Sequence, residues 1–175
     1  GIILSASHNP GGPDGDFGVK VNGANGGPTP ASFTDAVYDC SKTLEDYSIV
    51  DAPAISLQSP GQHTIGEMQV EVIDGVDDFV LLMKQLFDFD SISTLIRNDF
   101  PLAFDAMHAV TGPYATAILE DALGAPKGSV INGIPSPDFG GGHPDPNPVW
   151  AKPLMDLMMS AQAPGARCPR SCRPK

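Results

Sequence analysis

Residues 102–131 carry the clearest fold signal of the chain and read LAFDAMHAVTGPYATAILEDALGAPKGSVI. The apolar residues 102–104 predict a buried strand, and residues 129–131 predict a second one. Between them, Pro113 suits the first turn of a helix and Gly124 suits the position just after its end. A strand, a helix and a strand within about 30 residues predict a βαβ unit with parallel strands, and therefore the α/β class.

The flanking sequence predicts further short elements on both sides of this unit. Asp74 is a good N-cap for a helix whose apolar stripe runs from Val76 to Leu86. We also expect strands at 2–4, 18–21 and 68–72, helices at 31–47, 91–97 and around 154–158, and loops at 51–66 and 135–147. The many glycines and prolines, 19 and 18 of 175 residues, fit a chain rich in loops.

Composition and charge exclude several classes of function. With 41% hydrophobic and 18% charged residues the sequence predicts a globular protein. A net charge of −11 and a pI of about 4.4 argue against nucleic acid or an anionic membrane as the main partner, because both require Lys and Arg. No apolar run approaches the roughly 20 residues of a membrane span. Three cysteines form no disulfide framework, so we expect a cytoplasmic location. Because the chain starts at Gly1 in an apolar run, we expect a fragment.

The first loop, Ser5-Ala6-Ser7-His8-Asn9-Pro10-Gly11-Gly12, is the strongest candidate for chemistry. Glycines let backbone N–H groups approach a phosphate closely, and a proline stiffens the turn. His8 can donate a hydrogen bond to a phosphoryl oxygen. Taken alone, the loop also fits a plain connection between two elements, and a neighbouring Ser and His do not define a catalytic triad.

Other pairs of polar residues are candidates that the sequence explains more simply. They are Asp14 with Asp16, Asp105 with His108, His143 with Asp145, and Cys168 with Cys172. We interpret the first pair as solvated turn carboxylates, the second as framework beside a strand, and the third as part of a rigid proline-rich turn. The cysteines lack a second pair of ligands, which argues against a zinc site.

Four segments together resemble one family in the correct order. Residues 5–20, 70–74, 104–114 and 138–147 are similar to the α-D-phosphohexomutases, and the Pro-Gly-Gly-Pro continuation of the first loop resembles their phosphoglucomutase branch. The resemblance covers roughly residues 1–159. It implies parts of two mixed-sheet α/β domains: the later part of domain I at 1–73, with the phosphoserine loop, and most of domain II at 74–160. Residues 161–175 are basic and predict a disordered or non-native tail.

The resemblance also implies roles for individual residues. Ser7 would carry a phosphoryl group and exchange it with a hexose phosphate through glucose 1,6-bisphosphate, while His8 and Asn9 support the phosphoserine. Lys20 would act as the general base, or alternatively as an electrostatic clamp. One oxygen of the Ser7 phosphate would bind Mg²⁺. Ser5 stands where many members of the family have Thr.

Three of the family's four site loops are absent from this sequence. It contains no Asp-Gly-Asp-Gly-Asp-Arg loop for Mg²⁺, no Gly-Glu-Glu-Ser sugar loop and no Arg-containing phosphate loop of the last domain. We therefore expect an isomerase of the phosphoglucomutase type by family, in a chain that is inactive alone. There are two alternatives: a phosphomannomutase, and a non-catalytic binding or structural relative of the family.

Overall fold

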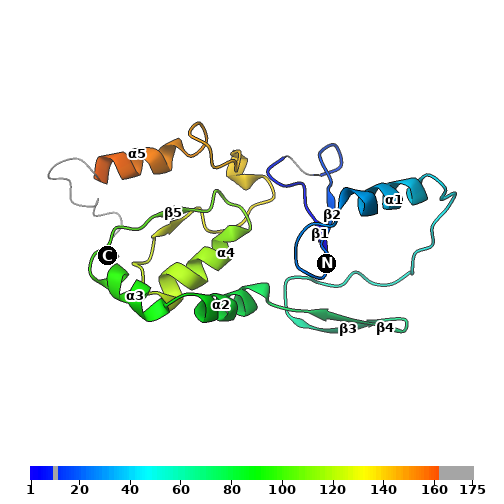
Figure 1. Cartoon of the computed structure of the whole chain (residues 1–175), viewed down its shortest axis with the longest axis horizontal. Helices are drawn as coiled ribbons and strands as arrows, with labels where there is room; N and C mark the ends of the chain where they lie inside the picture. Colours follow the sequence, from blue (N-terminus) through cyan, green and yellow to red (C-terminus); the bar gives the residue numbers. More distant parts are fainter. Residues whose placement is uncertain (10–11, 162–175) are drawn as a thin grey trace. The chain divides into compact units, whose positions relative to one another are not determined.

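The computed structural model describes residues 1–9 and 12–161, and it divides the chain into two compact units with a boundary between Ile73 and Asp74 (Figure 1). Small sheets and helices alternate in both, as the predicted α/β class requires. The predicted tail lies outside the described residues except for Ala161, the last residue of a helix. Within the described ranges, no helix is long and apolar enough to cross a lipid bilayer.

The first unit begins with a two-stranded antiparallel sheet. Strand β1 (Ile2–Leu4) pairs with β2 (Val19–Val21), and Ile3 lies opposite Lys20. Both strands agree with the sequence prediction. The sheet positions the loop between them, because its two ends are fixed by the strand register.

Helix α1 (Ala31–Ser41) follows, and the predicted extension of this helix to residue 47 is wrong. The helix stops early because side-chain hydroxyls take up its last carbonyl groups. Ser41 Oγ donates to the Tyr38 carbonyl at 2.7 Å, and Thr43 Oγ1 donates to the Cys40 carbonyl at 2.8 Å. Such local bonds compete with continued helix.

A second hairpin, β3 (Gly61–Ile65) and β4 (Met68–Val72), completes this unit. The prediction of β4 is confirmed, whereas the prediction of a loop over 51–66 is wrong for the five residues of β3. Gly66 adopts a φ of +60°, and a glycine at the first position of a two-residue turn is typical of tight hairpins. Only alternate residues of this short strand are half-buried. Its sequence pattern is therefore weak, and it follows residues that are typical of a loop.

The second unit opens with two capped helices, α2 (Gly75–Leu86) and α3 (Phe89–Arg97). The Asp74 side chain accepts a hydrogen bond from the Val76 N–H at 2.9 Å, which confirms the predicted N-cap. Asp88 caps α3 in the same way by accepting from the Ser91 N–H at 3.0 Å. Helix α3 therefore begins two residues before the predicted start at residue 91.

The predicted βαβ unit is confirmed. Strands β5 (Phe104–Asp105) and β6 (Val130–Ile131) are parallel, and α4 (Thr111–Ala115) continues into the π-helical segment η1 (Thr116–Ala122) between them. The first strand lies at 104–105, and only residue 104 of the predicted 102–104 belongs to it. Phe89, Ile92, Leu102, Ile118 and Leu119 pack against the buried core of Ile96, Leu123 and Ala125. The short helix η2 (Phe139–Gly141) and helix α5 (Lys152–Ala161) follow.

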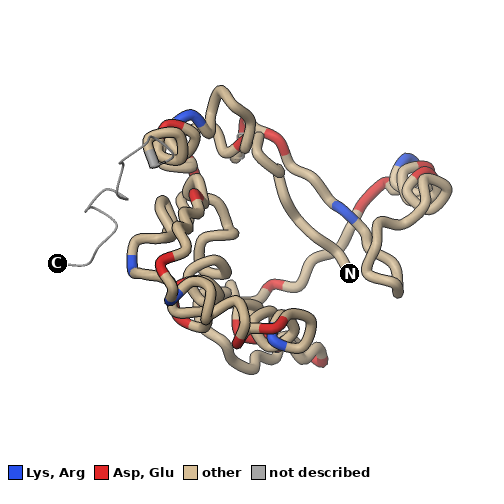
Figure 2. The backbone as a smooth tube through the Cα atoms, turned by 60° about the vertical axis from the view of Figure 1, so that its left-hand side comes forward, with Lys and Arg blue, Asp and Glu red and all other residues tan. Residues whose placement is uncertain are grey.

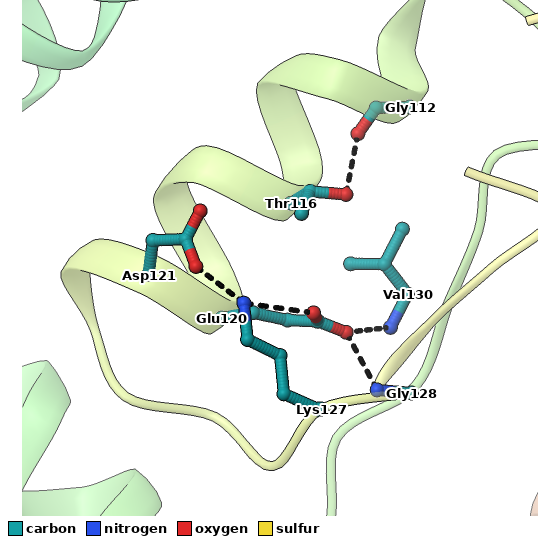
Figure 3. A network of polar contacts seen from close by, with 7 residues as sticks. All are labelled: Gly112, Thr116, Glu120, Asp121, Lys127, Gly128 and Val130. Atoms are coloured by element: carbon teal, nitrogen blue, oxygen red, sulfur yellow. Dashed lines mark hydrogen bonds and ion pairs between the residues drawn. The ribbon is translucent and has the colours of Figure 1, made fainter. Parts of the chain in front are cut away.

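One buried carboxylate joins the helix of this βαβ unit to its second strand (Figure 3). Glu120 accepts hydrogen bonds from the N–H groups of Gly128, at 2.9 Å, and Val130, at 3.0 Å. Its side chain is 6% exposed, and Lys127 Nζ lies 3.6 Å from its second oxygen. The two backbone bonds and the lysine offset the cost of burying the charge, and they fix where β6 begins.

Acidic residues outnumber basic ones, and the basic residues of the described chain are not gathered in one segment. Figure 2 shows Lys and Arg scattered singly along the described chain, among more numerous Asp and Glu residues. Figure 2 shows no continuous run of basic residues along the described part of the chain.

Candidate active site

The candidate loop is closed by a reciprocal pair of backbone hydrogen bonds. The Ser5 N–H donates to the Gly18 carbonyl at 2.9 Å, and the Gly18 N–H donates to the Ser5 carbonyl at 3.1 Å. A Cβ added at Gly18 would lie 2.4 Å from the Ser5 carbonyl oxygen, closer than any side chain tolerates. Only glycine therefore permits this closure. The sequence did not indicate this role for Ser5 or Gly18. The close contact joins residues that are far apart in the sequence, so no local pattern predicts it.

Ser7 lies near the start of this loop, with its side chain exposed. Its φ is +60°, a left-handed conformation that costs about 1–3 kcal/mol for a residue other than glycine. The Ser5 Oγ accepts a hydrogen bond from the Ser7 N–H at 2.9 Å, and the Asn9 N–H donates to the Ala6 carbonyl at 3.2 Å. These local bonds hold the strained turn and present the Ser7 hydroxyl to solvent.

His8 is the neighbour that the structure brings to Ser7. The Ser7 Oγ lies 3.5 Å from His8 Nδ1, at the long limit of a hydrogen bond. Both side chains are exposed, and Asn9 is half-buried beside them. Pro10 and Gly11, which are predicted to stiffen the turn and to let the backbone approach a phosphate, lie outside the described residues.

Lys20 is held by the sheet rather than by the loop itself. It sits in the middle of β2, two residues after Gly18, and its side chain is exposed. The closing pair therefore lies between the two residues: Ser7 is two residues beyond Ser5 in the loop, and Lys20, opposite Ile3, is two residues beyond Gly18 in the sheet. Asp14 and Asp16 are exposed loop residues, as predicted for solvated carboxylates, and the Gly15 N–H donates to the Gly12 carbonyl at 3.1 Å.

The polar pairs of the second unit have structural contacts of their own. Asp105 Oδ1 accepts from the Met107 N–H and from Asn132 Nδ2, both at 2.9 Å. His108 Nδ1 lies 3.0 Å from the Ile134 carbonyl. Asp105 and His108 form no hydrogen bond with each other, so these contacts link loops rather than form a catalytic pair.

The proline-rich turn after η2 is ordered by short-range bonds. The Asp145 N–H donates to the His143 carbonyl at 2.9 Å, and Asn147 Nδ2 donates to Asp145 Oδ2 at 2.7 Å. The His143 ring lies 5.0 Å from the Trp150 ring, centroid to centroid. These contacts agree with the interpretation of residues 143–147 as a rigid turn.

Comparison with known proteins places this loop in a family. Residues 1–48 match the family model "Phosphoglucomutase/phosphomannomutase, alpha/beta/alpha domain I". The chain is 56% identical over 164 residues to a phosphoglucomutase of Rhizobium radiobacter, covering 94% of this chain and 30% of the relative. It is 52% identical over 157 residues to a phosphoglucomutase of Schizosaccharomyces pombe, covering 89% and 28%.

A solved structure gives the same result. The crystal structure of the exocytosis-sensitive phosphoprotein pp63/parafusin, a phosphoglucomutase from Paramecium in its open form, matches with a TM-score of 0.83 and 44% identity. The match covers 93% of this chain and 31% of that one. The chain thus spans about 30% of the length of the relatives that it matches. Agreement in sequence and in fold over nine-tenths of its length shows that the chain belongs to the phosphoglucomutase/phosphomannomutase family.

Proposed function

We propose that this chain supplies the phosphoserine part of a phosphoglucomutase, with Ser7 as the phosphate carrier. In the reaction, phosphorylated Ser7 gives its phosphoryl group to the free hydroxyl of glucose 1-phosphate or glucose 6-phosphate. The resulting glucose 1,6-bisphosphate turns and returns its other phosphoryl group to Ser7. The observation that carries the proposal is the exposed Ser7 hydroxyl, in a strained turn held by Ser5 within the segment that matches the domain I family model.

The neighbours of Ser7 have distinct tasks in this proposal. Phosphoryl transfer depends on in-line positioning and on neutralising charge, and His8 and Asn9 hold phosphoryl oxygens for that purpose. Lys20 either accepts the proton of the attacking sugar hydroxyl or, as a cation, stabilises the charge of the transferred group. Lys20→Arg separates the two roles, because arginine keeps the charge but does not give up a proton at neutral pH. Substantial activity in Lys20→Arg supports the clamp, and its loss supports the base.

Mg²⁺ is the metal that the proposal requires. It is a hard cation that suits phosphate oxygens, and bound there it would neutralise charge on the transferred group. Among residues 1–9 and 12–73, no three potential ligand side chains gather within reach of one ion. The described part of the first unit would therefore give Mg²⁺ one ligand, an oxygen of the phosphate on Ser7. The other ligands must come from outside the described part of the first unit.

We also propose that the two units correspond to the later part of domain I and to most of domain II. The domain I match at residues 1–48 lies within the first unit, and the unit boundary follows Ile73. The substrate in this proposal is a hexose phosphate. The location is the cytoplasm, for which one relative named "Probable phosphoglucomutase, cytoplasmic 2" from Arabidopsis thaliana gives support, although chloroplastic relatives also match.

A chimaera tests the activity. In it, this chain's segment replaces the matching 164-residue segment of the R. radiobacter relative. Turnover of glucose 1-phosphate in a coupled assay with Mg²⁺ and glucose 1,6-bisphosphate is expected, with a loss of activity in Ser7→Ala. Ser41→Ala, a change at another exposed serine of the same unit, is the matched control and should retain activity.

Three outcomes separate the alternatives. A folded but inactive chimaera favours the non-catalytic relative, and faster turnover of mannose 1-phosphate favours a phosphomannomutase. The isolated 175-residue chain is expected to show no turnover, because the described part of the first unit, residues 1–9 and 12–73, offers the metal only the phosphate on Ser7. Robust turnover by the isolated chain would contradict the proposal that its site is incomplete.

A further inference from the structure

A pocket in the second unit lies where parallel strands end. It has a volume of about 300 Å³, and Asp105 and Asn132 line it. Asp105 is the last residue of β5, and Asn132 directly follows β6. In α/β proteins, ligands bind outside the carboxyl ends of parallel strands, and a volume of this size suits a single ring-sized ligand. The pocket is thus placed where such a sheet holds a ligand.

Strained backbone is concentrated at this pocket. Among the described residues, six other than glycine have a positive φ, and four of them line the pocket. These four are Met107, His108, Asn132 and Phe139, with φ between 51° and 54°. The His108 N–H donates to the Asn132 carbonyl at 3.0 Å, so two strained residues hold each other. Clustered strain of this kind is typical of sites that bind ligands.

The polar groups of the pocket are mainly hydrogen-bond acceptors. Asp105 binds its two neighbours through Oδ1 alone, and its Oδ2 accepts no bond from a described residue. Asn132 uses its Nδ2 as a donor to Asp105, which leaves its Oδ1 as an acceptor. The Ile134 carbonyl can only accept, so His108 Nδ1 is the donor of that contact. Acceptors of this kind suit a ligand rich in hydroxyl donors.

Trp150 and His143 form an aromatic wall of the same pocket. Their rings are tilted by 53°. The Asn147 side chain fixes the turn that carries the tryptophan, because its Oδ1 accepts from the N–H groups of Val149 at 2.9 Å and Trp150 at 3.2 Å. Trp150 is 49% exposed and lines the pocket, so its indole is accessible to a ligand that stacks on an aromatic ring.

The charges of the lining exclude two other classes of ligand. Neither Lys nor Arg lines the pocket, and the Asp105 carboxylate would repel an anion such as phosphate. A hard divalent cation requires several oxygen ligands, whereas Asp105 is the sole carboxylate of the lining. The remaining class of ligand is a neutral ring that has hydroxyl donors on its edge and an apolar face.

We propose that this pocket binds the ring of a neutral hexose, stacked on Trp150 and hydrogen-bonded through its hydroxyls to Asp105 and Asn132. This goes beyond the proposed function, because the site lies in the second unit and does not involve Ser7. A failure of the mutase proposal therefore leaves it standing, and Ser7→Ala should not change it.

Trp150 is the one tryptophan of the chain, so the fluorescence of the full 175-residue chain reports directly on the pocket. Addition of glucose should change the emission in a saturable way, with a dissociation constant on the order of 1 mM for so small a ligand. Asn132→Gly removes the amide but keeps a residue that accepts positive φ, and it should weaken glucose binding about fivefold. Asn98→Gly, at the end of α3, is the matched control and should bind as the parent does.

Circular dichroism establishes that each variant is folded before binding is compared. Inorganic phosphate and choline, tested in the same titration, should give no saturable change. A saturable response to either of these without one to glucose would overturn the proposal, because the site would then be one for an anion or an organic cation. Absence of a saturable glucose response in the folded parent, or equal weakening by Asn132→Gly and Asn98→Gly, would overturn it as well.

Discussion

Gly18→Ala tests whether the closing pair of the first loop positions Ser7. The new Cβ would lie 2.4 Å from the Ser5 carbonyl oxygen, so one of the two backbones must retreat by more than about half an ångström. That movement breaks or lengthens two hydrogen bonds of 2.9 and 3.1 Å. At about 1 kcal/mol each, their loss lowers the free energy of local opening by about 2 kcal/mol, which is roughly a 30-fold change in the opening equilibrium.

Two assays measure this effect. Hydrogen exchange at the Ser5 and Gly18 amides of the isolated chain should become roughly 30-fold less protected. In the chimaera, a displacement of more than about half an ångström beside the phosphate carrier should reduce turnover by about tenfold or more. Gly61→Ala is the matched control, because the added Cβ meets only the His63 side chain, at 3.7 Å. If Gly18→Ala behaves like this control in both assays, the closing pair does not position Ser7.

Three further predictions concern the second unit. Gly112→Ala brings a Cβ to 2.0 Å from a backbone carbonyl oxygen and should destabilise the unit by about 3 kcal/mol or more in urea unfolding. Glu120→Gln removes the charge from a buried acceptor of two backbone bonds and should cost about 1–3 kcal/mol, whereas the exposed Asp121→Asn should change stability by less than about 0.5 kcal/mol. Hydrogen bonds from the Ser136 hydroxyl and then the Gly140 N–H hold the pKa of Asp138 below its ordinary value of 3.8. Because a lowered folded-state pKa adds stability that is lost as pH falls through that pKa, Asp138→Asn should flatten the acid loss of stability below about pH 4 in thermal unfolding.

Local sequence signals predicted the elements whose chemistry lies within a few residues. Asp74 before an apolar stripe gave α2 its correct start, and apolar runs flanking a helix predicted the parallel pair of β5 and β6. Strand β3 was missed because its pairing with β4 depends on a partner strand and on Gly66, while its own pattern is weak. The end of α1 was misplaced because the hydroxyls of Ser41 and Thr43 compete for its carbonyl groups, an effect that apolar periodicity does not record.

The candidate site was likewise predicted only in part from the sequence. The motif around Ser7 was evident in the sequence, since each residue type in it suits a phosphate loop. The contacts that hold it were not, because the Ser5 hydroxyl bond and the Gly18 approach depend on the register of β1 and β2. The pocket of the second unit could not be predicted from the sequence for a related reason. Its residues come from segments at 105–108, 132 and 139–153, and the fold alone brings them together.

Mapping of the phosphorylated residue tests the central claim most directly. The chimaera is incubated with radioactive glucose 1,6-bisphosphate, digested with a protease, and the labelled peptide is located by mass spectrometry. The account predicts a single label on Ser7, which disappears in Ser7→Ala and persists in the Ser41→Ala control. A label on any other residue, or one that remains after Ser7→Ala, would contradict it.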